Sequence, residues 1–144
     1  MKKLIFNCSM LLSLLLCTNF TYTSSEAHTI VKTMLELEAV QDMIERDFDT
    51  PNITIVTNGL IPSDFNLFYA GKSIAVVDKQ QSTKPKNTDV ILEIINFKLE
   101  GQAAQVKFRY GDYRSNIKLK KEGDVWIHQS IVIRGDGYFH WTVG

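Results

Sequence analysis

The sequence predicts an α+β fold in which one N-terminal amphipathic helix packs on a curved antiparallel sheet of about six strands. Apolar residues recur at three- and four-residue spacing over residues 28–49, as they do on one face of a helix. Apolar and polar residues alternate over residues 104–110, which is typical of a strand with one buried face. Short turns separate most of the strand-like segments, and short turns join antiparallel neighbours. One helix lying across a curved sheet then buries the apolar faces of both.

Residues 1–27 have the layout of a secretion signal peptide. Two lysines precede an apolar stretch over residues 4–17, and a polar run leads from there to Ala27. Ser25 and Ala27 occupy the −3 and −1 positions of a cut before His28, where signal peptidase requires small residues. We therefore expect an exported protein, secreted or periplasmic, whose mature chain begins at His28.

Two other interpretations of the N-terminus stay open. Cys17 would be the lipidated residue of a membrane-anchored lipoprotein, although Leu16 stands where such proteins normally have Gly, Ala or Ser. An uncleaved anchor is the weaker alternative, because polar residues interrupt an apolar run that is already shorter than a membrane span.

The expected mature part, residues 28–144, has the size of a single domain. Its basic and acidic residues nearly balance, so we expect no nucleic acid and no anionic membrane surface among its partners. None of its stretches reaches the roughly 18 apolar residues that span a bilayer. Both cysteines, Cys8 and Cys17, fall in the signal, which excludes a disulfide, a thiol nucleophile and a cysteine-based zinc site.

The elements follow in order from the same patterns. The helix over residues 28–49 has Thr29 as its expected N-cap and ends at Thr50-Pro51, because a residue before proline is pushed away from helical angles. Residues 78–88 are polar and predict a loop, and residues 89–99 form an apolar run that fits a buried strand or a helix. The other strand-like segments cover residues 53–57, 65–69, 73–77, 104–110, 116–120 and 125–134.

Lys118, Lys120 and Lys121 stand close together in one of these strand-like segments. We expect them to form a solvated edge that discourages edge-to-edge aggregation of the sheet.

The segment over residues 117–130 resembles the last hairpin of nuclear transport factor 2-like and cystatin-like domains. The resemblance extends over residues 89–133 and implies an α+β domain of a kind that hosts enzymes, carriers and dimerising modules. Nuclear transport factor 2-like domains usually carry about three helices around a pocket. The sequence predicts only one long helix here, which favours the simpler arrangement of one helix on a sheet. The positions that match the alternating strand, the glycine turn, the tryptophan and the final strand are Leu119, Gly123, Trp126 and Ile127.

The leading functional interpretation is a small binding domain that does no chemistry. Aromatic residues gather near the C-terminus and would line a pocket or fill the core, and the core is favoured because the domain has no disulfide. A site on the concave face of the sheet would bind a small apolar molecule or a protein partner, without a cofactor, and a homodimer stays open. The candidate lining is Phe108, Tyr110, Trp126 and His128, and the other aromatic residues of the cluster are Tyr113, Tyr138, Phe139 and Trp141.

An enzyme of the nuclear transport factor 2-like type is the alternative. It would use His128 with Asp124 or Asp136 as an acid–base pair, since histidine titrates near neutral pH. Alternation places His128 on the strand face of Trp126 and Ser130, and His128 would meet His140 only if the last two strands pair. A half-buried histidine bonded to a backbone carbonyl is the favoured interpretation, and we expect no metal site.

A cystatin-like inhibitor or adaptor is the third interpretation. It would act through exposed loops, such as Asn58-Gly59 and residues 82–87. Unlike the other two, it predicts a domain without an internal cavity.

Overall fold

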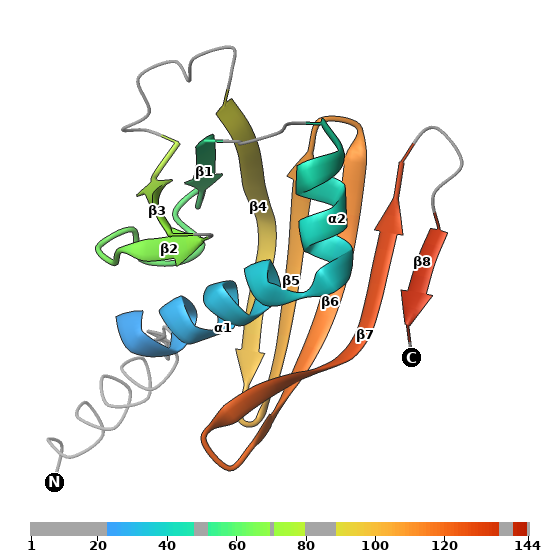
Figure 1. Cartoon of the computed structure of the whole chain (residues 1–144). Coiled ribbons are helices and arrows are strands. Elements are labelled where there is room, and N and C mark those ends of the chain that lie inside the picture. Colours follow the sequence, from blue (N-terminus) through green and yellow to red (C-terminus); the bar gives the residue numbers. More distant parts are fainter. Residues whose placement is uncertain (1–22, 48–51, 70, 80–88, 136–139, 144) are drawn as a thin grey trace, which may run out of the picture.

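Two helices lie on one face of a mixed eight-stranded sheet in the computed structural model of the chain (Figure 1). The structure describes residues 23–47, 52–69, 71–79, 89–135 and 140–143. The α+β class is confirmed, and in this described part neither helix is long and apolar enough to cross a membrane. The elements are α1 (Ser24–Glu36), α2 (Glu38–Asp47), β1 (Asn52–Val56), β2 (Leu67–Tyr69), β3 (Lys72–Val77), β4 (Asp89–Glu100), β5 (Ala103–Tyr110), β6 (Tyr113–Glu122), β7 (Val125–Arg134) and β8 (His140–Val143).

Helix α1 begins one turn before the predicted start. Its N-cap is Thr23 and not Thr29, because the Thr23 Oγ1 accepts a hydrogen bond from the Glu26 backbone N–H at 3.3 Å. The Thr29 hydroxyl instead donates to a backbone carbonyl one turn earlier, at 2.9 Å. Ala27 has no exposed surface, so the buried face of the helix reaches further toward the N-terminus than the large apolar residues indicate.

The helical segment is divided in two at Leu37, where the sequence predicts a single helix. Leu37 is extended (φ −70°, ψ 127°), and its carbonyl accepts hydrogen bonds from Val40 and Gln41 at the start of α2. Figure 1 shows that the two helices run in different directions over the sheet. An unbroken helix over the predicted range would be roughly 33 Å long, so the break lets both halves follow the curled sheet. Met34 and Ile44 are fully buried on either side of the break, so the apolar period gives no sign of it.

The strand order is β2-β3-β1-β4-β5-β6-β7-β8. Strand β1 is parallel to both β3 and β4, whereas the other neighbouring strands are antiparallel. The prediction of a purely antiparallel sheet is therefore wrong, and the sheet has eight strands where about six were predicted. Two parallel strands start at the same end of the sheet, so the chain between them must cross the sheet and needs a long connection. Long connections do separate β1 from β3 and β3 from β4. Residues 89–99, which fit a strand or a helix by sequence, belong to β4 in the middle of the sheet.

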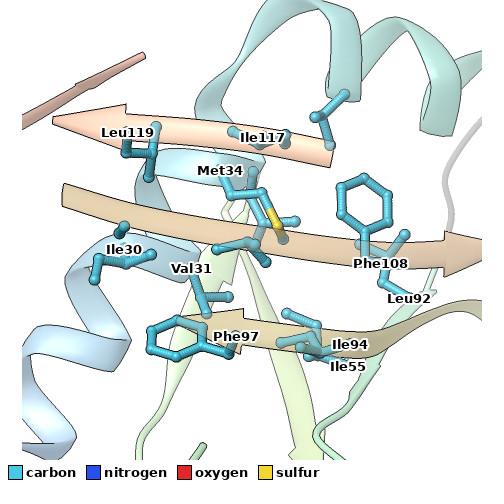
Figure 2. Packing of buried hydrophobic residues seen from close by; sticks show 14 of the residues in the cluster. Ile30, Val31, Met34, Ile55, Leu92, Ile94, Phe97, Phe108, Ile117 and Leu119 are labelled. Atoms are coloured by element: carbon cyan, nitrogen blue, oxygen red, sulfur yellow. The ribbon is translucent and has the colours of Figure 1, made fainter. Parts of the chain in front are cut away.

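The core lies between the helices and the sheet. Figure 2 shows side chains of α1 lying over apolar side chains of β1, β4, β5 and β6. The alternation over residues 104–110 is confirmed, since its four apolar side chains are buried on β5 while the polar ones point the other way. We call the second side, which the helices do not cover, the outer face of the sheet.

A bulge in β7 changes which of its residues share a face. His128 lies opposite Leu119 and Ser130 lies opposite Lys118, so Gln129 is an extra residue between two paired positions. Residues directly opposite each other on neighbouring strands point to the same face. His128 therefore shares the helix side with buried Leu119, and Ser130 shares the outer face with exposed Lys118. Strict alternation, which put His128 and Ser130 on one face, fails at this bulge.

Candidate functional site

Three of the four residues predicted to line a site are part of the core. Phe108 has no exposed surface, and Trp126 and Tyr110 are 3% and 9% exposed. The helices cover the face of the sheet on which these side chains lie. The Lys121 Nζ lies 5.9 Å from the centre of the Trp126 ring and so covers the ring on its solvent side. Packing accounts for all three side chains.

His128, the fourth residue, lies on the same side of the sheet as Trp126, but unlike the other three it is exposed. Among the described residues, no hydrogen bond or ion pair joins His128 to Asp124, which is also exposed. Asp136 lies outside the described residues, as do Tyr138 and Phe139. In the described segments no group of three or more histidine, cysteine, aspartate and glutamate side chains is placed to hold a metal ion. The structure therefore brings together no acid–base pair at His128 from the residues it describes.

The Asn58-Gly59 turn is tied to the sheet. Both residues have positive φ (53° and 69°), and the turn is closed by a hydrogen bond from the Leu60 N–H to the Thr57 carbonyl at 3.0 Å. The Asn58 side-chain amide donates to a carboxylate oxygen of Glu93 at 3.2 Å and to the Ile94 carbonyl at 2.9 Å. Residues 82–87, the other loop expected to act, lie outside the described residues.

The outer face of β4–β7 carries a group of lysine and arginine side chains, and we call these residues the basic face. Their side chains are exposed or half-buried, and each lies in register with a polar or small residue, or with another cation, on the next strand. Among the side chains that the structure describes, carboxylates on the same face are fewer and are Glu93, Glu100 and Glu122, of which Glu93 pairs with Arg109 and Glu122 with Lys120. The basic face consists of Lys98, Lys107, Arg109, Arg114, Lys118, Lys120 and Arg134.

Three arginines of the basic face stand in one line across three strands. Arg109 of β5 lies directly opposite Arg114 of β6, which in turn lies opposite Arg134 of β7. Like charges in directly opposed positions destabilise a sheet. Arg109 is compensated by an ion pair with Glu93, but no residue in the described segments forms an ion pair or hydrogen bond with the side chain of Arg114 or Arg134. A sheet with this arrangement holds positive charge that its own side chains do not neutralise.

Glu93 is the acidic end of the arginine line. Its carboxylate is 15% exposed and forms ion pairs with Arg109 and with Lys79, the latter at 3.1 Å, besides the hydrogen bond from Asn58. Partial burial would raise the pKa of this carboxyl group, but the hydrogen bonds from Lys79, Asn58 and Arg109, together with the charge of Arg109, outweigh burial. The pKa of Glu93 consequently lies below its ordinary value.

Replacing Glu93 with glutamine should lower the free energy of unfolding at neutral pH by about 1–2 kcal/mol, because hydrogen bonds to a charged partner are lost. Since the pKa is lower in the folded state, the stabilisation is present above the unfolded-state pKa of about 4.3 and is lost as the pH falls through the folded-state pKa. Urea denaturation at neutral and acidic pH measures both effects. The matched control is Glu36→Gln, because Glu36 is 59% exposed in its ion pair with Lys32 and should change little. A Glu93→Gln protein as stable as the parent at neutral pH would contradict this account.

A shallow open depression of about 220 Å³ lies within the basic face. Two cations, Lys98 and Lys118, and one acidic residue, Glu100, border it, and the amides of Gln105 and Gln129 add hydrogen-bond donors. Gln105 also donates to the Asn116 side chain at 2.8 Å, which fixes its orientation. The bulge of β7 helps to shape the depression, since Gln129 is the extra residue of that bulge.

Charge is separated between the two sides of the molecule. The exposed surface of the helices carries mainly carboxylates, whereas the opposite side carries the basic face. The two sets of charges are separated by at least the width of a helix, about 10 Å. The Debye length at physiological salt is about 8 Å, so the helical carboxylates neutralise the basic face only weakly. The near-zero net charge therefore conceals a locally positive surface. The exposed helical carboxylates are Glu36, Glu38, Asp42 and Glu45.

The basic face was missed by sequence analysis, which saw only Lys118, Lys120 and Lys121 as a solvated edge. Each cation stands at a polar position of an alternating segment, and that much is visible in the sequence. Their meeting depends on the register of four strands, including two bulges, at Ile95 and at Gln129. Lys121 itself lies on the other side, opposite Trp126.

Comparison of the chain with protein-family models, with curated proteins and with solved structures finds no match. The resemblance to nuclear transport factor 2-like and cystatin-like domains thus stays a prediction.

Proposed function

We propose that the chain is an exported, non-enzymatic binding domain that recognises an anionic partner through the basic face. The export part of the proposal rests on the signal-like pattern of residues 1–27. The binding part rests on one observation, the line of directly opposed arginines at positions 109, 114 and 134.

An anion between opposed arginines would relieve a repulsion that is present in the free protein. Arg114 and Arg134 are exposed, so a partner can reach both guanidinium groups without a change in the sheet. Guanidinium groups bind phosphate, sulfate and carboxylate groups through paired hydrogen bonds, which makes arginine well suited to such partners. Local arrangements that reduce stability are characteristic of functional sites. These points favour the basic face over the buried aromatic residues as the binding surface.

Binding to dextran sulfate, a soluble polyanion, tests the proposal. The double variant Arg114→Glu/Arg134→Glu should bind at least about tenfold more weakly than the parent chain, and binding by the parent should weaken as salt is raised. The matched control is Lys32→Glu/Lys72→Glu, which changes the net charge equally. Lys32 lies on α1 and Lys72 at the start of β3, both exposed and away from the basic face. Thermal melting of each variant shows that the fold is retained.

Equal weakening by the two double variants would contradict the proposal, since net charge alone would then explain the binding. Absence of salt-sensitive binding by the parent chain would contradict it as well. Expected instead is a large loss for the arginine pair and a small loss for the control.

A further inference from the structure

We propose that the anionic partner of the basic face is the surface of an anionic phospholipid bilayer. This inference rests on the proposed function and narrows it to one class of partner. The near-zero net charge predicted that no anionic membrane surface is a partner. The inference departs from that prediction, because in the structure the basic and acidic side chains lie on opposite sides of the molecule.

The cations of the basic face are spread in two dimensions. Along β6, Arg114, Lys118 and Lys120 extend over roughly 20 Å at the usual rise of a strand. Across the strands, the face continues from Lys98 on β4 to Arg134 on β7, a width of roughly 15 Å at the usual strand spacing. A linear polyanion would contact only one row of these cations, whereas a layer of lipid headgroups would contact all of them. The distribution of charge therefore favours a surface over a linear chain.

Aromatic side chains are missing from the outer face of β4–β7 in the part of the chain that the structure describes. Tyr110 and Phe108 belong to the helix side, and Trp126 does too. Proteins that bind single-stranded nucleic acids combine positive charge with aromatic platforms on which bases stack. The basic face has the charge without the platforms, which argues against nucleic acid.

Exposed aliphatic side chains lie at one end of the basic face. Val125 is 63% exposed and Ile127 is 39% exposed, and Ile127 lies opposite Lys120 on the outer face. Both lie within the first three residues of β7, which directly follow the β6–β7 hairpin. Figure 1 shows this hairpin at the end of the two strands. Aliphatic side chains next to cations are the combination by which peripheral segments enter the boundary between headgroups and acyl chains.

The depression between Lys98 and Lys118 offers a place for one headgroup. Its two ammonium groups and the amides of Gln105 and Gln129 are donors suited to a phosphate oxygen, and together they outnumber the one carboxylate in the lining, that of Glu100. The carboxylates of the helices lie on the opposite side, directed away from a bilayer that is bound there. Charge, apolar side chains and the depression thus agree on one orientation.

Co-sedimentation with vesicles tests the inference on the chain that begins at Thr23. We expect it to bind vesicles of phosphatidylcholine that contain roughly one third phosphatidylglycerol, to bind pure phosphatidylcholine weakly, and to be released by high salt. Arg114→Glu/Arg134→Glu should reduce partitioning at least about tenfold. Val125→Ser/Ile127→Ser should reduce vesicle binding several-fold while leaving dextran sulfate binding unchanged, because only a bilayer has an apolar layer.

The outcomes separate this inference from the proposed function. Binding to dextran sulfate without binding to anionic vesicles would overturn the bilayer as partner and leave an anion-binding face. Vesicle binding that is unaffected by the arginine substitutions would overturn the inference too, since another surface would then be responsible. Failure to bind either probe would overturn both proposals.

Discussion

A chain that starts at His28 should be about 2–3 kcal/mol less stable than a chain that starts at Thr23. The longer chain keeps the N-cap, worth about 1 kcal/mol. It also keeps Ala27, which has no exposed surface, and its loss would open a gap in the core. Chemical denaturation of the two chains measures the difference directly.

Two polar contacts add to the stability of the first turn. The Ser24 hydroxyl donates to the Asp64 carboxylate at 2.9 Å, and the Glu26 carboxylate lies 3.7 Å from the Lys121 ammonium group. The variant Ser24→Ala in the longer chain is the matched control, since it removes one exposed contact and should cost less than about 1 kcal/mol. Equal stability of the chains starting at Thr23 and His28 would show that the first turn is dispensable.

The result bears on export. The cut expected before His28 would separate the first turn of α1 from the rest of the domain, whereas a cut upstream of Thr23, or lipidation at Cys17, would leave the turn in place. If the shorter chain is as unstable as expected, the mass of the protein recovered from its host should correspond to a chain that starts at or before Thr23.

Replacing Phe108 with alanine should destabilise the domain by about 3–5 kcal/mol, which is the usual effect of removing a large aromatic side chain from a core. Phe108 is fully buried beneath α1 and α2, next to Leu92 in Figure 2. Total stabilities of single domains are about 5–15 kcal/mol, so a large part of the molecules would be unfolded. Thermal melting followed by circular dichroism is the measurement.

The comparison with His128→Ala decides between a core and a binding site. His128 was grouped with Phe108 as lining by sequence, yet it is exposed, and its substitution should change stability by less than about 0.5 kcal/mol. A Phe108→Ala protein that melts like the parent and loses affinity for an apolar ligand would instead favour the pocket that the sequence predicts.

Much of the fold could be predicted because its elements have one buried face. The alternation of apolar residues in β5 and their helical spacing in α1 follow directly from that burial. Strand β4 was ambiguous because it lies in the middle of the sheet and carries apolar residues on both faces, among them Leu92 on the helix side and Ile95, 44% exposed. The break at Leu37 could not be predicted, because no glycine or proline lies near it in the sequence.

The candidate site could not be predicted in the same way. Trp126 and Phe108 were selected as aromatic, and aromatic residues serve cores as readily as pockets. The arginines of β5, β6 and β7 are distant in sequence and become neighbours only through register. One extra residue, Gln129, decides which half of β7 contributes to which face. Local sequence patterns therefore predict which residues are buried, but they do not predict which strands pair or in which register.

The position of β1 between β3 and β4 gives the chain an order of folding. Strands β4 to β7 pair with their sequence neighbours and can form early, because closing short loops costs little entropy. The helices and β1 precede them in the chain, yet α1 packs on β7 and β1 needs β4 as a neighbour. During synthesis the contacts of β1 with β4 and of α1 with β7 therefore form only after those later strands emerge. On the proposal that residues 1–27 direct export, this order would keep the chain unfolded while a translocation channel can still accept it.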